Sequence, residues 1–248
     1  MAGDLVSLRM LLIAAARPDQ DLWRQGTAQA SLPVEFVAEE AVAAGNVLAK
    51  GGVDICVMDA DLPDAYKAAM ITVARKVKPS PLVFVSAALG CRRLEGVDGM
   101  LPKPGSIDGA RQLAEICIRA KIPTRVLIVD DSGTMRSIVR KILSASRFAL
   151  DVQEAVEGFA ALNQLRSGRF GLVFLDYNMP GFNGLETLSE IKRESPTVSV
   201  VMMSSTADNV VAERALTAGA LAFLKKPFFP ADIDAVLARY YGLNGPVN

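Results

Sequence analysis

The sequence predicts an α/β protein made of two doubly wound, parallel-sheet domains in tandem. Three observations support this prediction. Short apolar segments without polar alternation recur along the 248 residues, as expected of strands that are buried on both faces. Amphipathic helical patterns lie between these segments, which is typical of right-handed βαβ units. The same landmarks also occur twice, about 117 residues apart, which is too long for a solenoid repeat and therefore indicates a duplicated domain.

The duplication rests on apolar segments that recur in the same order. One pair of segments ends in an aspartate, Asp59 or Asp176, and a proline follows four residues later in both halves. A shared order of this length is not expected by chance. The matched segments are 8–13 and 125–129, 54–59 and 172–176, 81–86 and 199–204, and 101–104 and 225–227.

The helices follow from the apolar spacing between these strands. Met135, Ile138, Val139, Ile142 and Leu143 follow the i, i+3, i+4, i+7, i+8 spacing of an amphipathic helix. Similar patterns bring each half to about five strands and five helices. The predicted helices lie near residues 19–30, 38–50, 64–76 and 106–119, and near residues 135–143, 154–167, 185–193, 208–218 and 233–240.

We place the two domains at residues 1–120 and 121–248. The link between them, residues 120–124, is short, and Pro123 restricts its backbone. The helix that leads into this link also ends in the mainly apolar segment 116–118. We therefore expect the two domains to pack against each other.

Composition excludes several classes of protein. The 27 acidic and 27 basic residues cancel, so no general attraction to nucleic acid or to an anionic membrane surface is expected. The longest apolar run near the start, residues 10–16, is far shorter than the roughly 20 residues of a membrane span. Cys56, Cys91 and Cys117 lie in apolar segments and are odd in number, which fits buried free thiols. We expect a cytoplasmic protein.

The sequence contains no histidine. This excludes Ser-His-Asp and Cys-His catalysis, together with every metal site that has a histidine ligand. Carboxylates, lysine, hydroxyls and backbone groups remain as the available chemistry. Any bound metal should therefore be a hard cation held by oxygen ligands.

Polar side chains follow the strands of the second half at the edge where a ligand would bind. In a doubly wound sheet this crevice lies beyond the carboxyl ends of the strands, at the switch in strand order. The first strand ends at Asp130 and Asp131, the third at Asp176, the fourth at Ser204 and the fifth at Lys226. Clustered carboxylates repel one another, and a divalent cation such as Mg²⁺ relieves the repulsion.

Each of these side chains also has a simple structural explanation when it is taken alone. Asp130 could cap the following helix, Asp176 could cap the following turn, and Ser204 could merely end a strand. Lys226 could be a solvated surface charge. Their joint occurrence on successive strand ends favours a functional site, in which Lys226 supplies a positive charge and Ser204 a hydroxyl donor for a phosphoryl oxygen.

Residues 125–242 resemble the receiver domain of two-component response regulators, and the letters Asp-Tyr-Asn-Met-Pro from Asp176 onward resemble the single-domain chemotaxis (CheY-like) type. The resemblance implies a flavodoxin-like (βα)5 fold for each domain. It implies that Asp176 is the phosphoacceptor and that Asp131, Asp176 and the backbone carbonyl of Asn178 bind Mg²⁺. Asp130 would act on the ion largely through water.

The resemblance also implies roles for the later strands. Lys226 would pair with the phosphoryl group, Ser204 would close onto it, and Phe223 would turn inward on activation. The Lys226–Pro227 peptide bond would be cis. An aromatic residue at position 223 would, however, be packed in the core under either interpretation.

The partners follow from the same resemblance and from the missing histidine. A sensor histidine kinase or a histidine phosphotransfer protein would supply the phosphoryl group from its own phosphohistidine. The chain would catalyse only its own phosphorylation and dephosphorylation. After residue 242 the sequence leaves no room for a DNA-binding domain, so output would pass to an unknown protein target, with a homodimer or intramolecular domain pairing as further contacts.

The first half departs from this pattern. It keeps Asp59, Ser86 and Lys103, but Ala14 and Ala15 stand where the second half has its acidic pair. Without that pair a Mg²⁺ site loses most of its protein ligands, and Asp59 beside Lys103 is more simply an internal ion pair. We interpret this half as a degenerate pseudo-receiver that is not phosphorylated and serves as an interaction module.

Two further differences support this interpretation. The spacing from Ser86 to Lys103 is shorter than that from Ser204 to Lys226, so the intervening helix should have lost about one turn or more. The position three residues before the lysine, an aromatic in the second half, is Met100 here.

Three other classes of protein match parts of this sequence. The segment Asp59-Ala-Asp61 resembles the nucleophile pair of haloacid-dehalogenase-like phosphatases, but that motif belongs after the first strand of their fold, and Pro63 is unusual for it. A flavodoxin-like FMN-binding protein shares the fold but needs a hydroxyl- and Gly-rich phosphate loop after the first strand. A transcription factor would need a DNA-binding domain.

Overall fold

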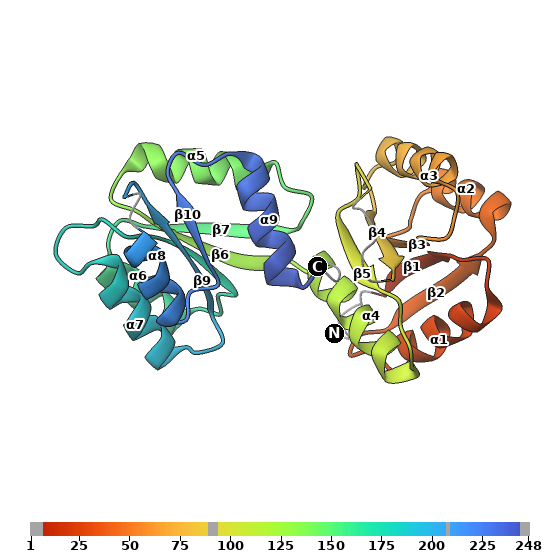
Figure 1. Ribbon diagram of the computed structural model, residues 1–248, viewed down its shortest axis with the longest axis horizontal. Helices are drawn as coiled ribbons and strands as arrows, with labels where there is room; N and C mark the ends of the chain where they lie inside the picture. The colour runs from red at the N-terminus through yellow and green to blue at the C-terminus, as the bar shows by residue number, and fades with distance from the viewer. Residues whose placement is uncertain (1–6, 89–93, 207–208, 244–248) are drawn as a thin grey trace, which may run out of the picture. The chain divides into compact units, whose positions relative to one another are not determined.

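The computed structural model describes residues 7–88, 94–206 and 209–243 and contains two compact units (Figure 1). The first unit comprises residues 1–122 together with 241–248, and the second comprises residues 123–240. The division falls near residue 122, and residues 241–243 group with the first unit. The domain bounds 1–120 and 121–248 stay a prediction.

The first unit is a parallel five-stranded sheet in the order β2-β1-β3-β4-β5. Helices α1 and α4 pack against each other, as do α2 and α3. In Figure 1 these two pairs cover opposite faces of the sheet. The elements are β1 (Leu8–Ile13), α1 (Arg17–Thr27), β2 (Val34–Glu39), α2 (Ala41–Lys50), β3 (Ile55–Asp59), α3 (Asp64–Lys76), β4 (Leu82–Ala87), β5 (Gly99–Pro102) and α4 (Ile107–Lys121).

This unit has four helices in its described residues, not five. The sequence predicted a shortened helix between Ser86 and Lys103. The described residues of that stretch form no helix, and residues 89–93, which include Cys91, lie outside the described residues. The other two cysteines, Cys56 and Cys117, are buried free thiols, as expected.

The second unit is a parallel sheet in the order β10-β9-β8-β6-β7, with helices on both faces (Figure 1). The predicted fold class, two flavodoxin-like doubly wound domains in tandem, is therefore confirmed. The elements are β6 (Thr124–Val129), α5 (Gly133–Ser144), β7 (Leu150–Ala155), α6 (Gly158–Ser167), β8 (Leu172–Asp176), α7 (Gly184–Glu194), β9 (Ser199–Ser204), α8 (Asn209–Thr217), β10 (Ala222–Lys225) and α9 (Pro230–Tyr241).

The second strand of each unit was missed by the apolar patterns. Strands β2 and β7 lie at sheet edges, and most of their residues are only partly buried. Their sequences, VEFVAE and LDVQEA, therefore mix apolar with polar residues. Edge strands need only one apolar face. The helix expected from residue 154 begins instead at Gly158, because Glu154 and Ala155 pair with β6 as the end of β7.

Strand β8 is the centre of the second unit. All five of its residues are buried, and it pairs with β6 on one side and β9 on the other. The strand order reverses between β8 and β6, which is the position where doubly wound sheets bind ligands. Two helices that start near this point carry side-chain caps: Ser132 accepts a hydrogen bond from the Met135 amide, and Asn183 with Glu186 forms a capping box.

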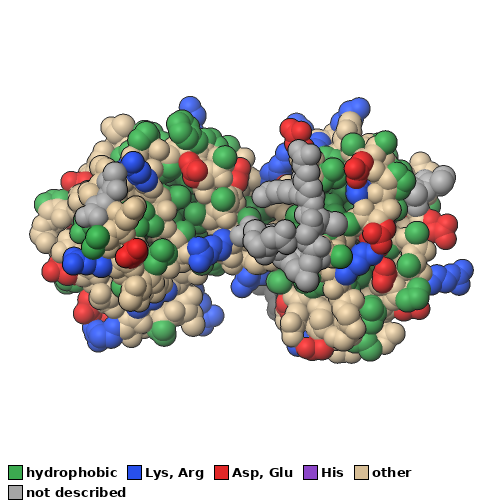
Figure 2. Space-filling view, viewed as in Figure 1, with side chains coloured by type: hydrophobic (Ala, Val, Ile, Leu, Met, Phe, Trp, Pro, Cys, Tyr) green, Lys and Arg blue, Asp and Glu red, His purple; other side chains and the backbone are tan. Residues whose placement is uncertain are grey.

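Basic and acidic side chains are interspersed on the face seen in Figure 2, in keeping with the net charge of zero. None of the helices within the described part of the chain is both long and apolar enough to cross a membrane.

Candidate functional site

Two buried carboxylates lie at the switch point of the second sheet. Asp130 follows β6 and is 1% exposed, and Asp176 ends β8 and is 3% exposed. The Ser132 amide donates a hydrogen bond of 2.9 Å to Asp130 Oδ1, which fixes the orientation of this carboxylate. Asp131, the next residue of the loop, is exposed. Buried acids of this kind are costly unless a cation or a hydrogen-bond donor faces them.

The cation that faces both acids is Lys226, which follows β10. Its ammonium Nζ lies 2.7 Å from Asp130 Oδ2 and 2.7 Å from Asp176 Oδ1. Its backbone amide donates to the Ser204 carbonyl at 2.7 Å, which ties this position to β9. The Lys226–Pro227 peptide bond is cis, as expected.

The electrostatics of the pair follow from burial and proximity. Burial raises the pKa of Asp176, and the hydrogen bond and charge of Lys226 offset this only in part. Burial acts to lower the pKa of Lys226, but its hydrogen bonds to Asp130 and Asp176 outweigh burial, so this pKa lies above its ordinary value. The ammonium is therefore charged, and it is the counter-ion of both carboxylates.

The acid cluster fits a magnesium ion. Carboxylate oxygens of Asp130, Asp131 and Asp176 lie within 4.8 Å of one another, the one such group of metal-binding side chains among the described residues. With Mg²⁺–oxygen distances of about 2.1 Å, opposite ligands lie about 4.2 Å apart, so the carboxylates are close to the required span. Asp131 is exposed, which leaves room for the waters that this ion retains.

Ser204 and Phe223 lie on the strands next to this cluster. Ser204 ends β9, is fully buried, and its Oγ accepts a hydrogen bond of 3.0 Å from the Thr206 amide. Phe223 in β10 is partly buried and packs against the core of the second unit. The core position expected for this aromatic is therefore present, and its movement on activation stays a prediction, as does the metal contact of the exposed Asn178 through its carbonyl.

A guanidinium that the sequence analysis missed holds the acidic loop in place. Arg136 of α5 donates from Nη1 to the backbone carbonyls of Asp130 (2.8 Å) and Asp131 (3.3 Å), and from Nε to Glu154 in β7 (2.9 Å). Arg140 contacts the other carboxylate oxygen of Glu154, and hydrogen bonds from Arg140 and Arg136 hold the pKa of Glu154 below its usual value. The sequence signal was two arginines four residues apart on one helix face.

Gly184, the first residue of α7, allows this helix to approach the site. A Cβ at this position would lie 2.4 Å from the Asp176 carbonyl oxygen and 2.7 Å from the Tyr177 Cα. Both neighbours are backbone atoms, which cannot move without moving the end of β8. The close approach therefore requires glycine.

In the first unit, the corresponding lysine is enclosed by acids. The Lys103 ammonium lies 3.0 Å from Asp59, 2.6 Å from Asp61 and 3.9 Å from Asp19. The predicted ion pair between Asp59 and Lys103 is thus present, and Asp61 and Asp19 are partners that the sequence analysis missed. Burial acts to lower the pKa of Lys103, but hydrogen bonds to Asp61 and Asp59 raise it above its ordinary value.

The acidic pair has no counterpart in this unit. Ala14 is buried, and its carbonyl accepts a hydrogen bond of 2.7 Å from the Gln20 side chain, while Ala15 is exposed. Ser86 is buried, and its Oγ donates to the Pro102 carbonyl at 3.3 Å. Asp59 follows the third strand of the unit, not the first, which argues against a haloacid-dehalogenase-like arrangement.

Comparisons with known proteins agree with this arrangement. Residues 126–238 match the family model described as the response regulator receiver domain. The chain is 35% identical over 119 residues to chemotaxis protein CheY-3 of Vibrio cholerae serotype O1, covering 47% of this chain and 91% of that protein.

Two further proteins extend the comparison. The chain is 28% identical over 138 residues to the cyclic di-GMP phosphodiesterase response regulator RpfG of Xanthomonas campestris pv. campestris, covering 55% of this chain but only 36% of that protein. A solved probable two-component system response regulator/GGDEF domain protein is 22% identical with a TM-score of 0.58, covering 95% of this chain and 98% of that one, which shows the same fold. The chain therefore belongs to the CheY-like receiver family of two-component response regulators, with two receiver-like domains in tandem.

Proposed function

We propose that the second domain accepts a phosphoryl group on Asp176 from a phosphohistidine of a partner protein. An oxygen of the Asp176 carboxylate attacks phosphorus, the phosphorus–nitrogen bond of the donor breaks, and the partner's imidazole leaves with its electron pair and takes up a proton. The observation that best supports this proposal is the buried Asp176 carboxylate 2.7 Å from the Lys226 ammonium, at the switch point of the sheet. The donor would be a sensor histidine kinase or a histidine phosphotransfer protein, because this chain has no histidine.

The remaining side chains would position and neutralise the incoming group. Lys226 would move from the carboxylates to the phosphoryl oxygens, and the Ser204 hydroxyl would donate to one of them. Asp130, Asp131, Asp176 and the Asn178 carbonyl would hold Mg²⁺, with Asp130 acting largely through water. When bound, the ion would neutralise charge on the transferring oxygens.

The first domain would not be phosphorylated and would act as an interaction module. Its lysine is already surrounded by Asp59, Asp61 and Asp19, and it lacks the acidic pair. Output would pass by contact with a protein target in the cytoplasm, without nucleic acid or membrane as a partner. The chain would catalyse only its own phosphorylation and dephosphorylation. We also propose that the two domains pack against each other, or that two copies of the chain do. Independent tumbling of the two domains in solution would contradict packing between them.

Magnesium titration tests the proposed metal site. We expect Mg²⁺ to shift the backbone amide NMR signals around Asp176 and to leave those around Asp59 unchanged. Among the described residues, only the second unit has three carboxylates with oxygens within 4.8 Å of one another. Tryptophan fluorescence would be a poor probe, since the single tryptophan, Trp23, lies in the first unit. Comparable shifts around both aspartates would contradict the assignment.

Lys226→Met should move metal binding and phosphorylation in opposite directions. Removal of the ammonium that contacts Asp130 and Asp176 eliminates a competitor, so Mg²⁺ affinity should rise roughly tenfold. Labelling by acetyl phosphate should fall roughly a hundredfold, because the cation that faces the phosphoryl group is lost. The control is Lys225→Met at the adjacent, exposed lysine, which should change neither quantity. A fall in both quantities for Lys226→Met would mean that the lysine only maintains the fold.

A further inference from the structure

The first unit holds the last residue of α9 and the residues that follow it. Tyr241, the final residue of α9, and Leu243 belong to the first unit and are 0% and 1% exposed. Gly242 between them has φ of 77°, the left-handed conformation in which glycine commonly ends a helix. The chain thus leaves α9 by a defined turn, and two large apolar side chains are buried on either side of it.

Backbone groups on both sides of this turn are satisfied by the first unit. The Met100 amide of β5 donates to the Leu243 carbonyl at 2.8 Å, and Arg119 Nη2 of α4 donates to the Tyr241 carbonyl at 2.8 Å. Strand β5 is an edge strand, whose outer amides need partners or water. Segment 241–243 therefore covers part of the edge of the first sheet.

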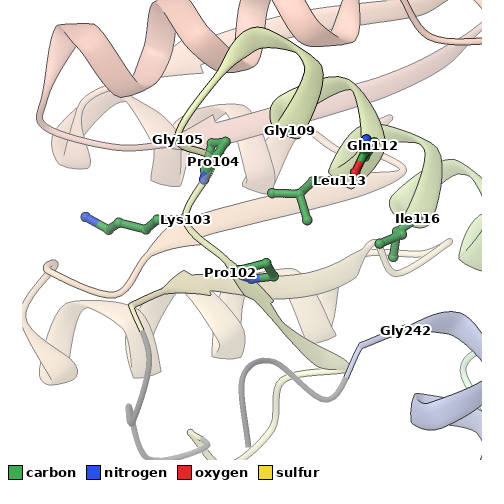
Figure 3. Close-up of a pocket in the computed structure, with 9 residues that line it drawn as sticks. All are labelled: Pro102, Lys103, Pro104, Gly105, Gly109, Gln112, Leu113, Ile116 and Gly242. Atoms are coloured by element: carbon green, nitrogen blue, oxygen red, sulfur yellow. The ribbon is translucent and has the colours of Figure 1, made fainter.

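Strand β5 has a glycine where Leu243 packs against it. A Cβ on Gly99, the first residue of β5, would lie 2.6 Å from the Leu243 Cβ and 3.2 Å from its Cγ, so the leucine occupies the space that a side chain would take. Beside it is a cavity of about 450 Å³, lined by residues of β5, α4 and their connection together with Gly242 (Figure 3). Leu113 and Ile116 form its apolar wall, and Lys103 extends away from them.

We infer that the first unit is a docking module whose ligand is segment 241–243 of this same chain, and that docking restrains the C-terminal turn of α9. This gives the degenerate domain a binding role that needs neither Mg²⁺ nor a phosphoacceptor, so the inference does not depend on phosphorylation of Asp176. The contacts are one buried leucine, one buried tyrosine and two backbone carbonyls, which is few enough for the segment to dissociate while both units remain folded.

Hydrogen exchange of the full chain tests the inference. In Gly99→Ala the new methyl group displaces Leu243, so the Met100 amide and the amides of residues 239–241 should exchange at least tenfold faster than in the unchanged protein. The matched control is Gly105→Ala in the same unit, where a Cβ meets no atom within 4 Å, and its exchange should be unchanged. Unchanged exchange of Met100 in Gly99→Ala, or faster exchange of Met100 without any change at residues 239–241, would overturn the inference.

A second variant separates docking from folding. Leu243→Gly adds no atoms and removes the side chain that Gly99 accommodates, so it should produce the same local acceleration while the amides of β1 and β3 stay protected. In Leu243→Gly, the further change Gly99→Ala should have little additional effect, because the two changes remove one contact. Additive effects would overturn the inference. Protection of Met100 that rises with protein concentration would also overturn it, since the ligand would then come from a second copy.

Discussion

Asp176→Asn is expected to abolish phosphoryl labelling of the chain, whereas Asp59→Asn should leave labelling nearly unchanged. Asparagine has no carboxylate oxygen that can attack phosphorus, so no acyl phosphate can form at position 176. The two aspartates occupy equivalent strand ends, and each is within 3.0 Å of a lysine ammonium. They differ because Ala14 and Ala15 stand where the second unit has Asp130 and Asp131. Loss of the cation that this acidic pair would bind should slow labelling by roughly a thousandfold.

The measurement is borohydride trapping of the acyl phosphate followed by mass spectrometry, with acetyl phosphate as the donor. Each variant should also be tested for folding by amide NMR. Asp176→Asn removes one of the two carboxylates that pair with Lys226, so that only Asp130 remains. Stoichiometric label on Asp59 in the unchanged protein would show that the first domain is not inert. Label that persists in Asp176→Asn would show that another side chain accepts the phosphoryl group.

Gly184→Ala should destabilise the second unit by about 3 kcal/mol, near the upper end of the usual range for overpacking. The added Cβ would lie 2.4 Å from the Asp176 carbonyl oxygen and 2.7 Å from the Tyr177 Cα, so the end of β8 or the start of α7 must shift. The same shift moves the proposed phosphoacceptor, and labelling should fall with stability. Hydrogen exchange of the slowest β8 amides measures the change in the free energy of unfolding.

Gly133→Ala is the matched control for this change. Gly133 is likewise the first residue of the helix that follows a site strand, but a Cβ there would meet only the Arg136 side chain, at 3.6 Å. Alanine should be neutral or stabilising by up to about 1 kcal/mol, because it has the higher helix propensity. Equal effects of the two variants would show that the short distances at Gly184 relax without cost.

The sequence was sufficient to predict that the main residues of the candidate site come together, because they occupy fixed positions in the fold. Asp130, Asp176, Ser204 and Lys226 each follow an apolar strand, and parallel strands bring their carboxyl ends to one edge. The edge strands β2 and β7 were harder to predict, since most of their residues are only partly buried and polar residues interrupt the apolar ones. Their sequences, VEFVAE and LDVQEA, follow a period-two alternation only in part, which is a weak signal.

Side-chain contacts between distant segments could not be predicted in the same way. Arg136 binds the carbonyls of Asp130 and Asp131, and Asp61 binds Lys103, through rotamers and loop paths that no spacing rule specifies. The return of Leu243 to β5 is a still longer-range event, which joins positions 100 and 243 through one hydrogen bond. Its sequence signal is an apolar leucine just after a glycine, and this signal is too weak to assign a partner.

The placement of residues 241–243 in the first unit affects how the second domain is connected to it. Because the first unit resumes after Tyr240, the whole of residues 123–240 is an insertion within it, not an appendage at its end. An inserted domain has both ends tied, so while segment 241–243 is bound, the unfolded second domain would be a closed loop with fewer conformations than a free chain. A truncated protein that ends at residue 122 would lack the segment that covers β5, and its open sheet edge would be prone to pair with other copies.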